Sequence, residues 1–204
     1  MLVKTINNQI RLSIFLGMIL LSPSVVSADY ESGCKAFKIR DYKTALYEFK
    51  RSANKGNASA QFALGVLYMK DRGAPQDYKK ALKWFSISAK QGNAFGLYAI
   101  GLMYDQGNGL PMDHEEAVNW YTKSAEHGFT DAQIKLGFIY SDYASSGVPH
   151  DKIKAHMWFY IADLKGNEMA HDLSRMTSNK MTPQQIAEAQ KLAREWMERF
   201  NKIR

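Results

Sequence analysis

Small and apolar residues recur along this chain in a helical pattern that repeats every 36 residues or slightly more. In each copy, a small residue is followed at offsets of four, five and eight by Leu or Ile, then Gly, then Tyr. These offsets place the four residues on one stripe of an α-helix. The three copies are Ala60, Leu64, Gly65 and Tyr68; Gly96, Ile100, Gly101 and Tyr104; and Ala132, Leu136, Gly137 and Tyr140. Because an interior Gly costs a helix about 0.5–1 kcal/mol relative to Ala, its recurrence predicts a neighbouring helix that crosses too closely for a side chain.

A second helix is predicted in each copy, after a loop rich in Gly and Pro. It opens with an Asp suited to cap free backbone N–H groups and closes with a Gly suited to a left-handed turn. Between them, Ala and an aromatic pair again have the spacing of a packed face. These residues are Asp77, Ala81, Trp84, Phe85 and Gly92; Asp113, Ala117, Trp120, Tyr121 and Gly128; and Asp151, Ala155, Trp158, Phe159 and Gly166.

A shortened copy of the same unit precedes the three complete ones. The residues that match the second helix are Asp41, Ala45, Phe49, Ala53 and Gly56. Its first helix is predicted over roughly 29–39, followed by a tight turn at Arg40 and Asp41, and aligning Phe37 with Tyr68 places Cys34 at the position of the repeated glycine. Cys34 is therefore predicted as a small buried packing residue, with a reactive or intermolecular thiol as the alternative.

The repeat fades after Gly166, and a closing helix follows. Residues 182–185, Thr-Pro-Gln-Gln, form a capping box with Pro at the first helical position. The apolar face of the next helix is Ile186, Ala189, Leu192, Ala193, Trp196 and Phe200. We expect this helix to cover the apolar end that a stack of repeats leaves open. The predicted fold is all-α: a right-handed superhelical solenoid of about four helix-turn-helix units over residues 29–166, with capping helices over 167–204.

The N-terminus has the features of a secretory signal peptide. Lys4 and Arg11 are followed by a short apolar run at 12–21, and the small residues of Val26-Ser27-Ala28 fit signal peptidase. The run has about half of the roughly 20 residues that a spanning helix needs. We therefore expect cleavage after Ala28 and a periplasmic or secreted chain. The alternative is an uncleaved anchor that tethers the protein to the membrane.

Charge and ligand-forming residues exclude several classes of function. The net charge of +7 comes from scattered lysines without a dense basic block, so no nucleic-acid partner is expected. Cys34 is the only cysteine, which excludes an internal disulfide. No histidine has a recognised metal-ligand spacing, so neither a metal nor a cofactor is predicted. The histidines are His114, His127, His150, His156 and His171.

The repeat unit resembles the Sel-one-like repeat, a relative of the tetratricopeptide repeat, over residues 30–166. The tail at 181–196 is also similar to the closing helix of exported bacterial proteins of this kind. In the third copy, eleven positions separate Tyr140 and Asp151 where the other copies have nine, so this loop departs from the pattern. The resemblance implies an adaptor or scaffold that holds other proteins.

A serine enzyme is the alternative function. The spacing Ser-x-x-Lys occurs at Ser32–Lys35 and Ser52–Lys55, and a cysteine-rich branch of the family has been linked to penicillin binding and β-lactam hydrolysis. The chain lacks the partner motifs Ser-Asp-Asn and Lys-Thr-Gly and the paired cysteines of that branch. We therefore predict a non-enzymatic scaffold, with a periplasmic enzyme acting on β-lactams or peptidoglycan as the alternative.

The predicted partner-binding face lies on the first helices, which usually line the concave wall in solenoids of this type. Each of its residues lies two positions after the small residue or the Leu or Ile of the repeated stripe. Together they would form an apolar track for an extended peptide or an amphipathic helix. The alternative is that they pack between neighbouring helices. We expect a protein partner, a monomeric chain, and no stable membrane insertion after cleavage. The candidate residues are Phe62, Val66, Tyr98, Leu102, Ile134 and Phe138.

Overall fold

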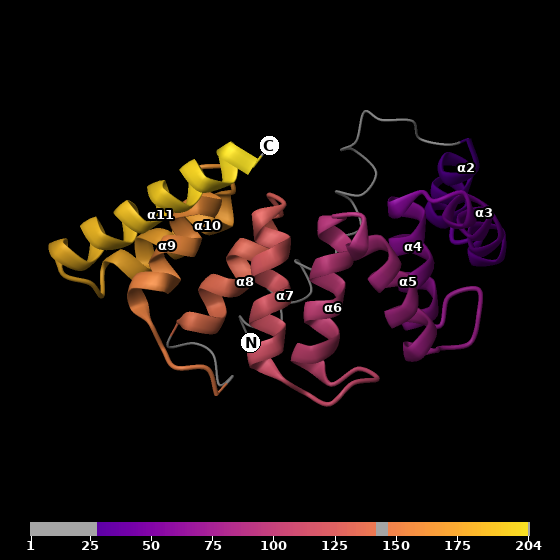
Figure 1. Ribbon diagram of the computed structural model, residues 1–204, viewed down its shortest axis with the longest axis horizontal. Coiled ribbons are helices and arrows are strands. Elements are labelled where there is room, and N and C mark those ends of the chain that lie inside the picture. The colour runs from indigo at the N-terminus through magenta and orange to yellow at the C-terminus, as the bar shows by residue number, and fades with distance from the viewer. Residues whose placement is uncertain (1–27, 142–146, 204) are drawn as a thin grey trace. The chain divides into compact units, whose positions relative to one another are not determined.

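The computed structural model describes residues 28–141 and 147–203, and every regular element in these two ranges is an α-helix (Figure 1). The predicted all-α class is therefore confirmed. The predicted signal peptide falls almost wholly outside the described residues, as does part of the third loop. The ten helices are α2 (Ala28–Lys38), α3 (Tyr42–Asn54), α4 (Ala58–Met69), α5 (Tyr78–Lys90), α6 (Ala94–Gln106), α7 (His114–Glu126), α8 (Thr130–Tyr140), α9 (Lys152–Asp163), α10 (Glu168–Ser178) and α11 (Pro183–Ile203).

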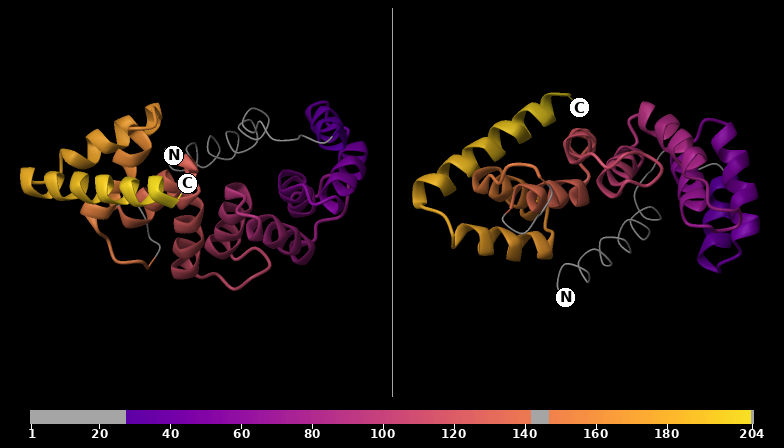
Figure 2. Two further views of the ribbon diagram at one scale, coloured as in Figure 1. Left: turned by 45° about the horizontal axis from the view of Figure 1, so that its top comes forward. Right: turned by 90° about the horizontal axis from the view of Figure 1, so that it is seen from below.

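The helices form two compact units, which divide between Pro111 and Met112. In unit 1, each helix from α2 to α6 packs against the next one in the chain. In unit 2, α7 packs on α8 and α8 on α9, while α9 also holds both α10 and α11. Figure 2 shows the helices of each unit from two further directions. This consecutive pairing confirms the predicted helix-turn-helix repeats. The boundaries of the predicted domains, at 28 and 166, stay predictions.

The predicted helix ends are present where the sequence places them. Each capping Asp accepts a hydrogen bond from the backbone N–H three residues later, which satisfies one free donor of its helix. The four N–H···O distances are 3.1 Å for Asp41, 2.9 Å for Asp77, 2.9 Å for Asp113 and 3.0 Å for Asp151. The four closing glycines have φ of +90° at Gly56, +75° at Gly92, +85° at Gly128 and +80° at Gly166.

The repeated glycines lie where an aromatic ring of the paired helix meets the first helix. A Cβ at Gly65 would lie 2.6 Å from two ring carbons of Phe85, and one at Gly137 would lie 2.5 Å from the ring of Phe159. Both rings are fully buried. The predicted close crossing is thus confirmed, and the group that excludes a side chain is the aromatic ring of the hairpin partner.

The shortened first repeat requires one correction. Gly33, and not Cys34, occupies the glycine position, because a Cβ at Gly33 would lie 2.6 Å from the ring of Phe49. Cys34 lies one position further on and is half-buried against the core of α2, α3 and α4.

A backbone hydrogen bond gives the same register independently. The N–H of Asp41 donates to the carbonyl of Ala36 at 2.9 Å, as that of Asp77 donates to Tyr68 at 2.9 Å. Ala36 and Tyr68 each lie three residues after the glycine position. The tight turn predicted at Arg40 and Asp41 is present, with Arg40 at φ +63°, but the alignment carried across it was wrong by one residue. Ala36, and not Phe37, therefore corresponds to Tyr68 of the first complete repeat.

The closing helix forms as predicted. The capping box is reciprocal: the N–H of Thr182 donates to Oε1 of Gln185 at 2.9 Å, and the N–H of Gln185 donates to Oγ1 of Thr182 at 3.3 Å. The apolar face of α11 packs on α9, where the rings of Trp196 and Trp158 meet edge to face with centroids 5.2 Å apart. The helix thus covers the second helix of the last repeat.

We predict that Gly65→Ala destabilises the chain. The added Cβ would overlap the Phe85 ring in a fully packed interior, and overpacking of this kind costs about 1–3 kcal/mol. The better helix propensity of Ala recovers only about 0.5–1 kcal/mol. Urea denaturation followed by circular dichroism should show a lower midpoint with an unchanged slope.

Phe85→Leu provides the control, because it removes the ring that the new Cβ would meet. In that background, Gly65→Ala should cost less than it does in the native chain, which gives a favourable coupling energy in a double-mutant cycle. Equal costs in the two backgrounds would contradict the glycine–ring contact as the reason for the glycine.

Candidate functional site

Four of the six predicted partner-binding residues are buried. Phe62, Val66, Tyr98 and Ile134 are each no more than 4% exposed. The ring of Phe62 lies between α5 and α6, with centroid distances of 5.6 Å to Phe85 and 5.7 Å to Phe95. These side chains hold neighbouring helices together in the structure, as the packing alternative expected. Their role towards a partner stays a prediction.

The other two predicted residues remain half-exposed. Leu102 lies near the end of α6 in unit 1, and Phe138 near the end of α8 in unit 2. Phe138 also packs edge to face on Phe159, with centroids 5.4 Å apart, so part of its ring belongs to the core. Each unit therefore offers one apolar side chain of the predicted track to solvent.

The repeated tyrosines are a surface feature that the sequence analysis missed. Tyr68 and Tyr140 pack against the cores of their units, as their place on the stripe predicts, but part of each ring stays accessible at the end of its helix. The ammonium of Lys80 lies 5.5 Å from the ring centroid of Tyr68, and that of Lys154 lies 5.2 Å from the ring of Tyr140. These are cation–π contacts.

The sequence contains a pattern that predicts these tyrosine–lysine pairs. Each lysine stands three residues after the capping Asp and also pairs with its carboxylate, at 3.0 Å for Lys80–Asp77 and 3.5 Å for Lys154–Asp151. Asp-x-x-Lys therefore marks the repeats in which a tyrosine is covered by a cation. In the second complete repeat, Glu116 stands at the lysine position.

The two Ser-x-x-Lys spacings do not bring a lysine to a serine. Lys35 Nζ is paired with Glu31 at 3.1 Å, and Lys55 Nζ is held by Asp29 at 2.6 Å. Ser52 is fully buried in α3. In a serine enzyme of this type the lysine must reach the nucleophile, and here the lysines are engaged elsewhere.

Two structural features are absent from residues 28–141 and 147–203. No group of three or more His, Cys, Asp or Glu side chains in that part of the chain could hold a metal ion. No helix there is both long and apolar enough to cross a bilayer. Burial raises the pKa of the Cys34 thiol, and a hydrogen bond from Tyr30 only partly opposes this. Cys34 therefore lacks the lowered pKa of a reactive thiol.

His156 is the one histidine that is buried in the described part of the chain. It is 3% exposed in α9, and its ring is stacked near that of Tyr160 with centroids 6.1 Å apart. Burial lowers the pKa of His156 below its ordinary value, opposed in part by the backbone of Ser174 and the carboxylate of Asp163. The neutral ring thus packs between α9 and α10.

We predict that His156 makes unit 2 less stable in acid. Because the folded state binds the proton less readily than the unfolded state, stability falls as the pH drops below the ordinary His value of about 6.5. His156→Phe should flatten the dependence of the urea midpoint on pH between about 7 and 5. His127→Gln, at an exposed position, is the control. An unchanged slope in His156→Phe would contradict the prediction.

Together, these features define an all-α protein built from repeated helical hairpins, in which an aromatic ring packs on a glycine of the paired helix. The Sel1 repeat family matches residues 58–93, 94–129 and 130–167, and the chain belongs to this family. It is the family that the sequence resemblance indicated. Repeats of this kind generally build protein–protein interaction scaffolds and are typically non-enzymatic.

Two solved structures share the fold. One is c5321, a protective antigen present in uropathogenic Escherichia coli strains and displaying an SLR fold, with 31% identity, a TM-score of 0.68 and 78% of this chain covered. The other is a Sel1 repeat protein from Oxalobacter formigenes, with 28% identity, a TM-score of 0.62 and 71% of this chain covered. The chain spans only 33% of the first protein and 57% of the second. A search of curated proteins gave no match.

Proposed function

We propose that this chain is an exported scaffold that binds an envelope or extracellular protein. The observation that carries the proposal is the run of three matched Sel1 repeats, since proteins of this family generally act by holding other proteins. The engaged lysines of the two Ser-x-x-Lys spacings lend no support to an enzyme. A scaffold needs only a rigid surface, and packed hairpins provide one.

In each unit, the proposed contact surface is the accessible part of its first helices. Leu102 and Phe138 keep half-exposed apolar groups, and Tyr68 and Tyr140 add half-exposed aromatic rings. Aromatic and large apolar side chains anchored in a packed framework are typical centres of binding energy, because little conformational entropy is lost when they are covered. The buried members of the predicted track, such as Phe62, would support this surface from beneath.

Export is the second part of the proposal. Asp29 would be the first residue after cleavage, and its carboxylate is held by Lys55 at 2.6 Å and Arg51 at 3.1 Å. A chain that begins at Asp29 would therefore keep both of these contacts to α3.

We predict that the chain recovered after expression in a bacterium with its own N-terminus begins at Asp29. N-terminal sequencing and intact mass measurement of the periplasmic and culture fractions provide the check. Ala28→Leu is the matched variant, because signal peptidase requires a small residue there, and it should accumulate uncleaved in the membrane fraction. A native chain that keeps residues 1–28 would exclude a free exported form.

We predict that a specific partner is lost when the first-helix surface is altered. Crosslinking in envelope extracts should identify the partner, and its affinity for the purified chain can then be measured by calorimetry. Leu102→Ala and Phe138→Ala should each weaken the affinity about fivefold or more, the effect of removing at least about 1 kcal/mol at an anchor.

Two controls separate a contact from a change in fold. Met112→Ala removes an apolar side chain that is 65% exposed but lies on a loop and not on a first helix, so the affinity should not change. Phe62→Leu loosens the interior without altering the surface, so it should lower the stability more than the affinity. If all four variants bind equally well, the partner does not use the first helices.

A further inference from the structure

The second helices present four positions to solvent, on the side opposite their buried Ala and aromatic residues. These positions lie two, six, nine and thirteen residues after the capping Asp and form one stripe of the helix. On α5 they hold Lys79, Lys83, Ser86 and Lys90, and the three lysines are exposed. The helix contains four lysines and no carboxylate.

The basic stripe recurs on α3 and is absent from α7. On α3, the same positions hold Lys43, Tyr47, Lys50 and Asn54. On α7, they hold Glu115, Asn119, Thr122 and Glu126. The helix fold therefore accepts either charge at these positions, and the lysines are a property of unit 1 alone.

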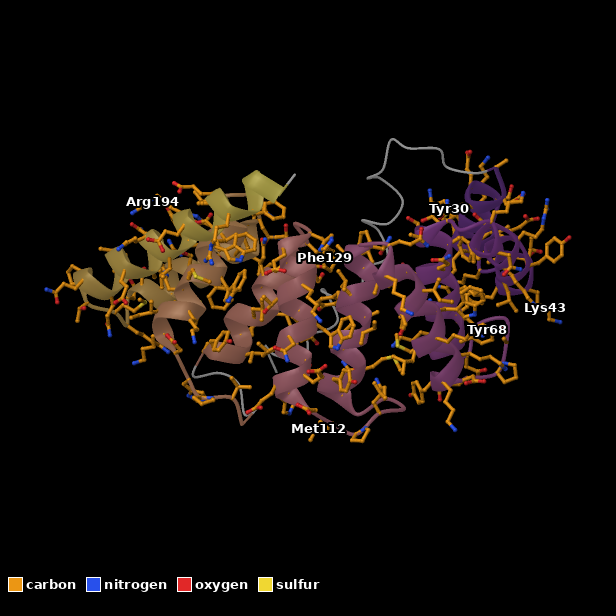
Figure 3. All side chains as sticks on the ribbon, in the orientation of Figure 1. Tyr30, Lys43, Tyr68, Met112, Phe129 and Arg194 are labelled. Atoms are coloured by element: carbon orange, nitrogen blue, oxygen red, sulfur yellow. The ribbon has the colours of Figure 1, made fainter. Side chains whose placement is uncertain are left out.

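Repeat geometry puts the two basic stripes on the same side of unit 1. Both α3 and α5 pack on α4, and successive hairpins of a repeat array differ by only a small rotation. Equivalent positions on the two helices consequently point in similar directions. Figure 3 shows Lys43 at the outer edge of the unit, pointing away from the helices. The resulting surface, called here the outer lysine face, consists of Lys43, Lys50, Lys79, Lys83 and Lys90.

Few carboxylates of unit 1 balance the charge of this face. Four of the seven in residues 29–111 hold other cations: Glu31 holds Lys35, Glu48 holds Arg51, Asp77 holds Lys80, and Asp29 holds both Arg51 and Lys55. The charge of Lys43 contributes to lowering the pKa of Asp41. In the described part of the chain, none of the five lysines of the outer face makes an ion pair. Residues 29–111 hold 13 Lys and Arg against 7 Asp and Glu, whereas residues 112–204 hold 12 against 13.

Exposed apolar groups accompany these lysines. Tyr47, between Lys43 and Lys50 on the α3 stripe, is 61% exposed. Ile39, in the turn just before α3, is 77% exposed and stands between Lys38 and Arg40 in the chain. An aliphatic or aromatic side chain surrounded by basic ones is the pattern of a surface that rests in the headgroup region of a bilayer.

We infer that the outer lysine face docks reversibly on a membrane surface rich in anionic phospholipid, with Tyr47 and Ile39 entering the headgroup region. The five charges of the face are lysines, while Arg51 lies over the ring of Tyr47 at 5.7 Å and Arg40 follows Ile39 in the chain. A layer of lipid phosphates requires only diffuse positive charge. A bilayer also accepts the exposed Tyr47 and Ile39 in its headgroup region, which favours a membrane over an acidic protein segment. The inference does not depend on the proposed protein partner.

The test uses the chain recovered after export, so that the signal segment does not contribute. Its binding to vesicles of mixed phosphatidylglycerol and phosphatidylcholine is compared with its binding to pure phosphatidylcholine by sedimentation. Each lysine near an anionic surface contributes about 1 kcal/mol, or about fivefold in affinity. Changing Lys79, Lys83 and Lys90 to Gln should therefore weaken binding about 100-fold. Raising NaCl from about 0.1 to 1 M should release the native chain.

The matched control removes the same charge from unit 2. Lys152→Gln, Lys191→Gln and Arg194→Gln also replace three exposed basic residues and should leave vesicle binding within about twofold, since net charge alone would affect both variants alike. Equal losses in the two triple variants, or equal binding to neutral vesicles, would overturn the inference. Tight binding to polyglutamate together with weak binding to anionic vesicles would assign the face to an acidic protein instead.

Discussion

The contact between an aromatic ring and a helix glycine is the constraint on which the hairpins at Gly33, Gly65 and Gly137 depend. The ring of Phe85 occupies the space that a Cβ of Gly65 would need, and Phe159 does the same at Gly137. Only a residue without a side chain lets the two helices come this close. The buried alanines of the second helices, such as Ala81, complete the same interface because they too add little bulk. Interiors of this density do not tolerate even one extra methylene without cost.

Because this packing uses only the inward side of each second helix, the outward side is free to differ. The same four positions are basic on α3 and α5 and acidic or polar on α7. On α9 they are Ile153, Met157, Tyr160 and Leu164, and α11 packs against that helix. One backbone plan thus gives a charged surface in unit 1 and a site for the closing helix in unit 2. The repeats are recognised by their inward residues, while the outward residues differ from one repeat to the next.

Local features could be predicted because their determinants lie within a few residues. An Asp cap, a left-handed Gly and the Thr182–Gln185 capping box each need only one turn of chain. The assignment of Cys34 failed because it depended on the length of a turn, and Arg40 closes that turn in a left-handed conformation usually taken by Gly. The partner face was harder still. An apolar residue such as Phe62 has the same spacing whether it faces solvent or lies between two helices, as it does here.

The sequence by itself determined the helix boundaries, the hairpin repeat and the positions that face inward, because all three follow from periodicity and local hydrogen bonding. Only the tertiary structure decided which first-helix residues stay accessible and that Gly33, and not Cys34, meets Phe49. The reason is that burial and the grouping of charges depend on which helices meet in space. The pattern along one helix shows which of its sides is apolar, but not what covers each side.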